Sequence, residues 1–328
     1  MKHLFIINPY SFRKTPVLMM NVLSEITDCF SSKSKNDYEV YTSRYIRDAI
    51  PSVFRYLMES DGDPVRVYAV GGNGILFDCL NGIVDFPNAE LTCVPYGSGN
   101  DFVRAFGYNA LPRFRNIKNL IKGKVHHVDI IHSGSNYALQ ELNIGLIGQT
   151  IINKNVVFPY IPVKIMRKNL GLAYSVCALK TMVNNESRPQ NYTVLADDED
   201  ISGKYFNIHV ANNGCNGGTL TPSPYAIPNS GYMDIILAKT DSRLKILSAM
   251  GDYNKGKFEK YDFFIHKRCK KLVIKSDSIL QVEMDGEGFL AQEINLEILP
   301  GHIKFFAPEG MEFMDYSRKA FKGKAVNN

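Results

Sequence analysis

The chain has 328 residues, of which 45% are hydrophobic and 22% charged, and its formal net charge is +5. This length and composition are ordinary for a soluble globular protein, with room for two domains and a large core. The small positive charge permits an anionic partner such as ATP or a membrane surface. It argues against a nucleic-acid partner, which usually needs a more concentrated basic charge.

Cysteine spacing and hydropathy set the expected location of the protein. The six cysteines are scattered and form no C-x-x-C pair, so the sequence predicts neither a zinc site nor a disulfide framework. A reduced, cytoplasmic setting is expected. Because no stretch of about 18 apolar residues occurs, any membrane contact is expected to be peripheral, at the inner face of the membrane.

The first third of the chain alternates short apolar runs with amphipathic ones. This rhythm predicts βαβ units and a parallel sheet, in which ligands bind beyond the carboxyl ends of the strands. In chain order the expected elements are a strand at 4–8, a helix at 14–30, a strand at 38–43, a helix at 48–60, a strand at 65–70, a helix at 75–84, a strand at 90–97 and a helix at 100–107.

The pattern changes after about residue 125, where strand-like runs follow one another with turn residues between them. This arrangement favours an antiparallel sandwich. The expected strands lie at 126–134, 136–148, 191–198, 204–213, 232–240, 270–277, 279–287, 294–301 and 302–308, with helices near 160–184 and 241–251.

The fold class is therefore predicted as α/β plus β. A Rossmann-like parallel-sheet domain at 1–124 would bind nucleotide, and an antiparallel β-sandwich at 125–308 would bind the substrate. Residues 309–328 are expected to form a tail that returns to the first domain.

Two glycine turns are the first candidate sites. "GGNG" at 71–74 stands between a strand and a helix, so its free N–H groups would favour an anion. It does not match the dinucleotide pattern G-x-G-x-x-G, because Phe77 occupies the third glycine position. "PYGSGND" at 95–101 repeats the arrangement one strand later, with Ser98 as a phosphate donor and Asp101 near a helix start. The alternatives are a tight turn without a ligand for "GGNG" and a helix-capping role for Asp101.

A third candidate is "MDGEGF", which places Asp285 and Glu287 in a turn between strands. Such a turn is often no more than a hairpin connection. A carboxylate in a cleft can also act as general base on a hydroxyl.

Together and in this order, these elements resemble the diacylglycerol kinase catalytic-domain family, which includes bacterial lipid kinases and sphingosine kinases and shares a superfamily with the NAD kinases. The resemblance runs from "NPYS" to "APEG". Its most specific part is "PYGSGNDFVRAFG", which is similar to the family pattern P-x-G-T-x-N-D-F-A-R. The other matching segments are "NPYS", "TSRYIRDA", "GGNGILFDCLNG", "LNIGLIGQT", "PYAIPNSGYMDI" and "DGE".

The resemblance implies that ATP and Mg²⁺ are used at a site between two domains, with a lipid hydroxyl as phosphate acceptor. Glu287 would be the base that deprotonates the hydroxyl, with Asp285 beside it, in a reaction that depends mostly on positioning and electrostatics. Asp101 would contact metal through water. The implied nucleotide-binding residues are Asn8, Thr42, Gly71, Gly72, Asn73, Gly74, Ile75, Ser98 and Asn100.

The lipid tail would lie in an apolar cleft of the second domain. The basic, amphipathic stretch at 158–171, "FPYIPVKIMRKNLG", would rest on an anionic membrane surface, and a surface helix with a solvated basic face is the alternative. An exposed strand edge in the second domain leaves a homodimer open.

The chain departs from the family pattern at several positions. Asn73 and Ser230 replace aspartates, and the second of these is linked to a structural Mg²⁺ in the family. Because a Mg²⁺ network depends on carboxylates, this metal site is expected to be degraded at Ser230. The remaining replacements are Ile75 for Thr, Asp78 for Glu, and Arg47 and Phe12 for Gly.

Three hypotheses follow. The first is an ATP-dependent lipid kinase with Glu287 as its base. The second is a non-catalytic family member that binds nucleotide or lipid. The third is a kinase of a soluble hydroxyl compound such as NAD.

Overall fold

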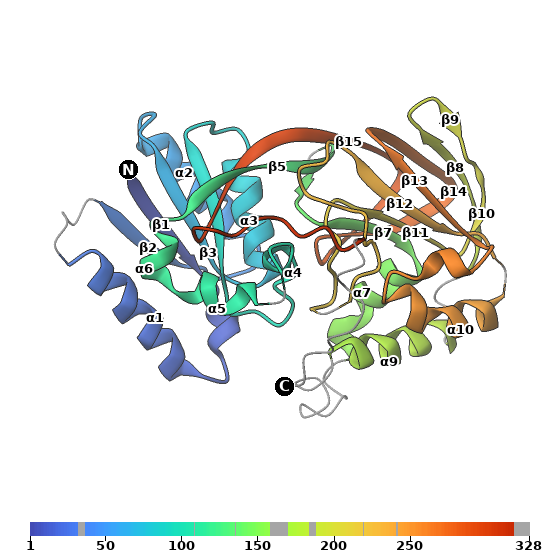
Figure 1. Cartoon of the computed structure of the whole chain (residues 1–328), viewed down its shortest axis with the longest axis horizontal. Coiled ribbons are helices and arrows are strands. Elements are labelled where there is room, and N and C mark those ends of the chain that lie inside the picture. Colours follow the sequence, from blue (N-terminus) through green and yellow to red (C-terminus); the bar gives the residue numbers. More distant parts are fainter. Residues whose placement is uncertain are drawn as a thin grey trace.

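The computed structural model describes residues 1–31, 37–107, 109–134, 136–157, 170–183, 188–218, 220–240 and 242–317. The chain forms two lobes side by side, joined by two long strands that cross between them (Figure 1). The basic stretch predicted at 158–171 lies almost entirely outside the described residues.

The first lobe is built on the predicted parallel strands. Its strands pair in the order β2–β1–β3–β4, all parallel, and the apolar runs of β1, β3 and β4 are buried. The strands are β1 (Lys2–Ile7), β2 (Tyr38–Thr42), β3 (Val65–Gly71) and β4 (Ala89–Pro95). The helices are η1 (Pro9–Phe12), α1 (Pro16–Cys29), α2 (Ala49–Glu59), α3 (Asn73–Ile83), α4 (Asp101–Arg104), α5 (Ala110–Arg115) and α6 (Ile117–Leu120).

The second lobe is an antiparallel β domain with its own apolar core. Its strands are β6 (Asn136–Ala138), β7 (Glu141–Gly145), β8 (Gln190–Ala196), β9 (Glu199–Asp200), β10 (Gly203–Tyr205), β11 (Asn207–Ala211), β12 (Met233–Ala238), β13 (Phe264–Cys269) and β14 (Lys271–Met284). Its helices are α7 (Leu146–Val157), α9 (Leu170–Val183), α10 (Arg243–Tyr253) and η3 (Phe258–Lys260).

The two lobes share one continuous sheet. The connecting strands are β5 (Lys124–Ser133) and β15 (Glu287–Ala307), which pair antiparallel with each other. β15 pairs with β14 at its start and meets β4 near its end, at Phe305 and Leu91. Its register against β5 shifts between Leu299 and Ile303, where a bulge interrupts the ladder.

Two differences from the predicted elements affect the site. The run at 136–148 is not one strand, because it ends in β7 and passes directly into the helix α7, which was not predicted. The runs predicted as four short strands between 270 and 308 form only two, β14 and β15, because their turn-like interruptions are bulges within continuous strands.

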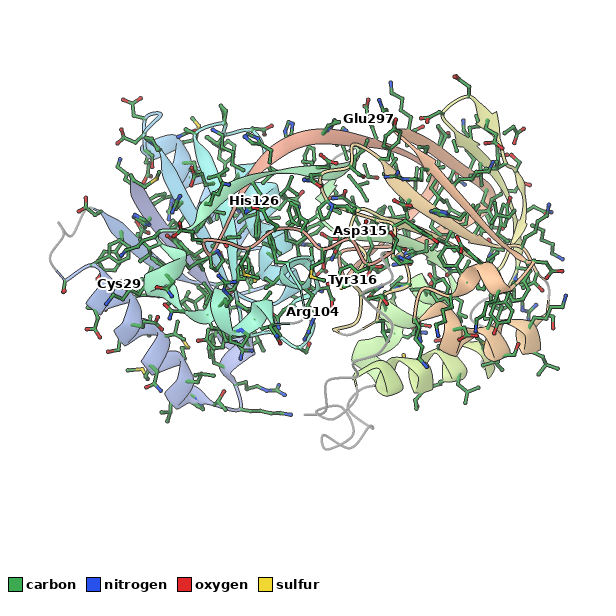
Figure 2. All side chains as sticks on the ribbon, viewed as in Figure 1. Cys29, Arg104, His126, Glu297, Asp315 and Tyr316 are labelled. Atoms are coloured by element: carbon green, nitrogen blue, oxygen red, sulfur yellow. The ribbon has the colours of Figure 1, made fainter. Side chains whose placement is uncertain are left out.

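Beyond β15 the chain returns across the first lobe. The Met314 N–H donates to the Ala105 carbonyl at 2.7 Å, and Arg113 Nη2 donates to the Glu309 carbonyl at 2.6 Å. Figure 2 shows Tyr316 beside Arg104, whose carbonyl accepts the tyrosine hydroxyl. This segment therefore covers α4, the helix that begins at Asp101.

Candidate active site

The two predicted glycine turns pack directly against each other. The N–H groups of Tyr96 and Gly97 both donate to the Gly71 carbonyl, each at 2.8 Å. A Cβ atom on Gly97 would lie 2.3 Å from the Gly72 Cα, so neither turn has room for a side chain here. The contact presents the start of α3, whose first N–H groups have no partner within the helix and favour an anion.

Asn73 and Asp101 join these turns through a reciprocal pair of hydrogen bonds. Asn73 Nδ2 donates to Asp101 Oδ2 at 2.6 Å, and the Asp101 N–H donates to Asn73 Oδ1 at 3.0 Å. The other carboxylate oxygen of Asp101 accepts the Gly218 N–H at 2.5 Å. The pair therefore fixes α3 to α4 and ties both to a loop of the second lobe.

The other predicted nucleotide-binding residues gather at the carboxyl edge of the parallel strands. Thr42 and Ser98 are exposed there. Asn8 follows β1, and its Oδ1 accepts the Tyr10 N–H at 3.0 Å. Asn100 is buried and exchanges hydrogen bonds with Gly97 at 2.7 and 3.1 Å, so it shapes the turn.

Ile75 differs from the other members of this predicted set, because its side chain is buried in the core of the first lobe. Only its backbone N–H, in the first turn of α3, remains suited to an anion.

Glu287 lies beside the glycine turn although it is more than 200 residues away in the chain. It is the first residue of β15, and its Oε1 is 3.6 Å from where a Cβ on Gly74 would stand. Its Oε2 is 3.4 Å from Nη2 of Arg47. The structure thus brings the predicted base to the predicted phosphate turn. It also adds Arg47, whose position in the sequence showed only a departure from the family glycine.

Asp285 is buried, and its carboxylate points toward backbone N–H groups and not toward Glu287. Its carboxylate accepts the N–H groups of Leu139, Gln140 and Glu141 at 2.8, 3.0 and 2.9 Å. Burial raises the pKa of Asp285 to about 7, although these hydrogen bonds act in the opposite direction. These contacts give Asp285 the role of holding the segment before β7 in place.

The side chains at the two positions that the family resemblance links to metal, Asp101 and Ser230, do not fit a structural Mg²⁺. The Asp101 carboxylate is bonded to an amide and a backbone N–H, as described above. Ser230 Oγ donates to the Tyr232 carbonyl at 3.3 Å, and the neighbouring Asp129 carboxylate accepts the N–H groups of Gly231 and Gly301 at 2.6 and 2.7 Å. In the part of the chain that the structure describes, no group of three or more His, Cys, Asp or Glu is placed to hold a metal ion.

A buried polar network lies in the second lobe, behind this site. Asn143 Nδ2 donates to Glu283 Oε2 at 2.7 Å, which leaves Asn143 Oδ1 to accept a hydrogen bond from His209 Nδ1 at 2.6 Å. Burial lowers the pKa of His209 to about 3, so this histidine is neutral. Burial and the nearby Glu283 raise the pKa of Glu141 well above its usual value. The network thus links β7, β11 and β14 through buried polar side chains that hydrogen-bond with one another.

An apolar pocket opens in the second lobe among α7, α9, α10 and β12. It contains about 850 Å³ of empty space, a figure that includes the solvent at its open mouth. Leu146, Ile147, Ile151, Ala178, Ile236, Ala238, Ile246, Met250, Tyr253 and Phe264 form most of its lining.

The helix α7 connects this pocket to Glu287. Ile151 lines the pocket, while Ile152 packs against Gly288, where an added Cβ would come within 2.9 Å of the isoleucine Cγ1. α7 therefore contacts both the pocket and Gly288, the residue that follows Glu287.

Comparison with known proteins agrees with this architecture. Residues 2–133 match the diacylglycerol kinase catalytic domain, and residues 163–307 match the YegS C-terminal NAD kinase beta sandwich-like domain. The chain thus combines a diacylglycerol kinase catalytic domain with a YegS-type C-terminal domain, and it is a lipid kinase-like protein.

Individual relatives carry the same designation. The protein named "Putative lipid kinase SH2167" from Staphylococcus haemolyticus is 26% identical over 77% of this chain and 80% of its own length. "Probable lipid kinase YegS-like" from Shewanella frigidimarina is 26% identical over 78% and 81%. A crystal structure titled as a putative diacylglycerol kinase from Bacillus anthracis has the same fold, with a TM-score of 0.72 at 21% identity over 95% of this chain and 98% of that one.

Proposed function

We propose that this protein transfers the γ-phosphate of ATP to the hydroxyl of a lipid. One observation carries the proposal: the carboxylate of Glu287 lies beside the glycine turn at the start of α3, and the next residue, Gly288, packs on the helix α7, which lines an apolar pocket. A candidate general base, a helix start suited to an anion and an apolar pocket therefore occur in one region of the molecule, and this reaction requires groups of these three kinds.

In the proposed reaction, the first-turn N–H groups of α3 and the exposed Thr42 and Ser98 hold the phosphates of ATP. Mg²⁺ would enter bound to ATP and neutralise the charge on its phosphates. Glu287 accepts the proton of the lipid hydroxyl while the oxygen of that hydroxyl attacks the γ-phosphorus. The bond to the β-phosphate oxygen breaks, and ADP leaves.

The test is an ADP-release assay with ATP, Mg²⁺ and mixed lipids that include diacylglycerol, a sphingoid base and undecaprenol. Glu287→Gln should lower turnover by about 10²- to 10⁴-fold, because the base is lost while the shape is kept. Glu293→Gln is the matched control, since Glu293 is an exposed residue of the same strand. Background turnover by the unmodified protein with every lipid would reject the proposal.

A binding-only role is the second candidate, and the Asn73–Asp101 pair favours it, because an amide stands where the family has a carboxylate. In that case ATP or lipid should bind with micromolar affinity while no ADP is released. The apolar lining of the pocket argues against a soluble acceptor such as NAD.

We further propose that the pocket receives its lipid from an anionic membrane surface. In the described part of the chain, none of the helices combines the length and apolar character that a membrane crossing needs. α9 and α10 lie side by side on the outer face of the second lobe and both line the pocket (Figure 1). They expose Val176, Leu179, Leu244 and Leu247 together with Lys180 and Lys245.

Flotation with phosphatidylglycerol-containing vesicles tests this contact. Leu179→Glu should reduce binding severalfold, because it places a carboxylate in the proposed contact. Met58→Glu, on α2 of the first lobe, should not. Equal binding by both variants would reject a contact through α9 and α10.

A further inference from the structure

Arg47 has a backbone conformation that its residue type does not favour. Its φ is +69°, in the left-handed region where residues with a Cβ are strained. The other non-glycine residues with positive φ in the described part of the chain are all Asp or Asn, which tolerate this region. An arginine here therefore needs a compensating contribution from its side chain.

The side chain of Arg47 lies along α3 and reaches the candidate base. Its Nη1 donates to Asp78 Oδ1 at 2.7 Å, and its guanidinium carbon is 4.3 Å from the centre of the Phe77 ring. Its Nη2 is 3.4 Å from Glu287 Oε2. One planar group thus links a buried carboxylate on α3 to the partly exposed carboxylate at the start of β15.

We propose that Arg47 is a positioning residue, which uses Asp78 as its anchor to hold the Glu287 carboxylate beside the first turn of α3. This inference rests on the proposed function, in which Glu287 is the base. Asp78 and Phe77 fix the guanidinium from two sides, so the orientation of Glu287 depends on a group of the protein itself. Arg47 also separates two carboxylates that would otherwise repel each other.

The electrostatics agree with this geometry. Burial raises the pKa of Asp78, and the negative charge of Glu287 raises it further, while the hydrogen bonds and charge of Arg47 lower it. The guanidinium therefore favours the ionised form of its anchor, and an ionised anchor holds the guanidinium more strongly.

Arg47→Gly is an informative variant because glycine prefers the φ that arginine strains to adopt. The fold should be kept, which thermal unfolding would check. We expect kcat to fall by about 10- to 100-fold while the affinity for ATP changes less than twofold, because only the placement of the base is lost. Arg47→Lys should recover part of kcat, as should ethylguanidinium added to the Arg47→Gly protein. Arg44→Ala, an exposed arginine nearby, is the control and should match the unmodified protein.

Two results would overturn the inference. One is an unchanged or higher kcat in Arg47→Gly, with the unmodified protein active. The other is a loss of ATP affinity as large as the loss of kcat, which would make Arg47 a phosphate ligand.

Crystal structures of the unmodified protein and of Arg47→Gly provide a readout that does not need turnover. The Glu287 carboxylate should occupy one position near Gly74 in the first and several positions, or a different one, in the second. The same single position in both would overturn the inference even if the protein proves to be inactive. Inactivity of the unmodified protein with a displaced Glu287 in the variant would reject the proposed function alone.

Discussion

Asn73 and Asp101 satisfy each other with two hydrogen bonds, one from the asparagine amide to the carboxylate and one from the aspartate backbone to the amide oxygen. The first bond uses the amide N–H of Asn73, which an ionised aspartate lacks. An aspartate at position 73 would place a second carboxylate oxygen about 2.6 Å from the first. The replacement is thus built into the junction between the two glycine turns.

Asn73→Asp should therefore weaken the protein in the absence of metal. Two adjacent carboxylates would repel, and we expect the free energy of unfolding to fall by about 1–3 kcal/mol at neutral pH. Acidification to about pH 5 or addition of millimolar Mg²⁺ should recover much of this loss, since a proton or a cation can lie between the two carboxylates. Thermal unfolding with and without Mg²⁺ measures the effect, with Asn119→Asp on the exposed face of α6 as control. Equal stability of the two variants would show that the hydrogen-bonded pair contributes nothing.

Gly97→Ala should disrupt both glycine turns. The added methyl would lie 2.3 Å from the Gly72 Cα, and the backbone must shift to accept it. We expect a loss of about 1–3 kcal/mol in stability and at least tenfold weaker ATP binding. Gly251→Ala in α10 is the matched control, because no atom lies within 4 Å of its Cβ position and alanine favours a helix. Calorimetry and nucleotide titration of both variants decide the point, and unaltered nucleotide affinity in Gly97→Ala would count against the site.

Ala178→Phe should separate the two substrates of the proposed reaction. The phenyl group would fill part of the apolar pocket, so KM for the lipid should rise about tenfold while KM for ATP stays within twofold. Met58→Phe alters a residue of α2 that is 61% exposed and lies outside the pocket and the proposed membrane contact, so it should leave both constants unchanged. An unchanged KM for the lipid in Ala178→Phe would place the lipid elsewhere.

His209 should make the fold sensitive to acid. Its pKa is about 3 in the folded protein and about 6.5 in the unfolded chain. Between these values the unfolded chain binds a proton that the folded protein does not bind, so the free energy of unfolding falls as the pH is lowered from about 6.5 toward 3. The slope from this group approaches about 1.4 kcal/mol per pH unit.

Urea unfolding across this pH range tests the role of His209. In His209→Asn, whose amide can still donate to Asn143, the slope should be reduced by about one proton. His302→Asn, at an exposed histidine of β15, should keep the slope of the unmodified protein, and a parallel pH profile in His209→Asn would refute the assignment.

The overall architecture could be predicted because the pattern of apolar residues along the chain reflects which faces of each strand are buried. Parallel strands covered on both faces appear as continuous apolar runs such as "LFII" and "VRVYAV", and antiparallel strands appear as short runs with turn residues between them. α7 was missed because its start, "LIGQTII", follows β7 without a Ser, Thr, Asp or Asn directly before it and is rich in isoleucine, which favours strands. β15 was divided because Pro300–Gly301 has the composition of a turn, whereas it occupies a bulge.

The candidate site was predictable only where a motif spans consecutive residues. The glycine turns and the "DGE" segment were recognised in this way. The partners of Asn73 and of Arg47 could not be, because Asn73 meets Asp101 from 28 residues away and Arg47 meets Asp78 from 31. The spacing of residues within a short motif does not indicate contacts between residues so far apart in the chain. The role of Asp285 was hidden for the same reason, since its three N–H donors lie more than 140 residues before it.

The strand β15 begins at Glu287 in the second lobe and ends at Ala307 in the first, and β5 runs beside it for much of this length. A free hinge between the lobes would have to shear this ladder and break its hydrogen bonds. Torsion at the bulge between Leu299 and Ile303 breaks none, because the ladder is already interrupted there. A change of twist at this bulge would therefore alter the distance between Glu287 and the glycine turn while the ladder on either side of it stays paired.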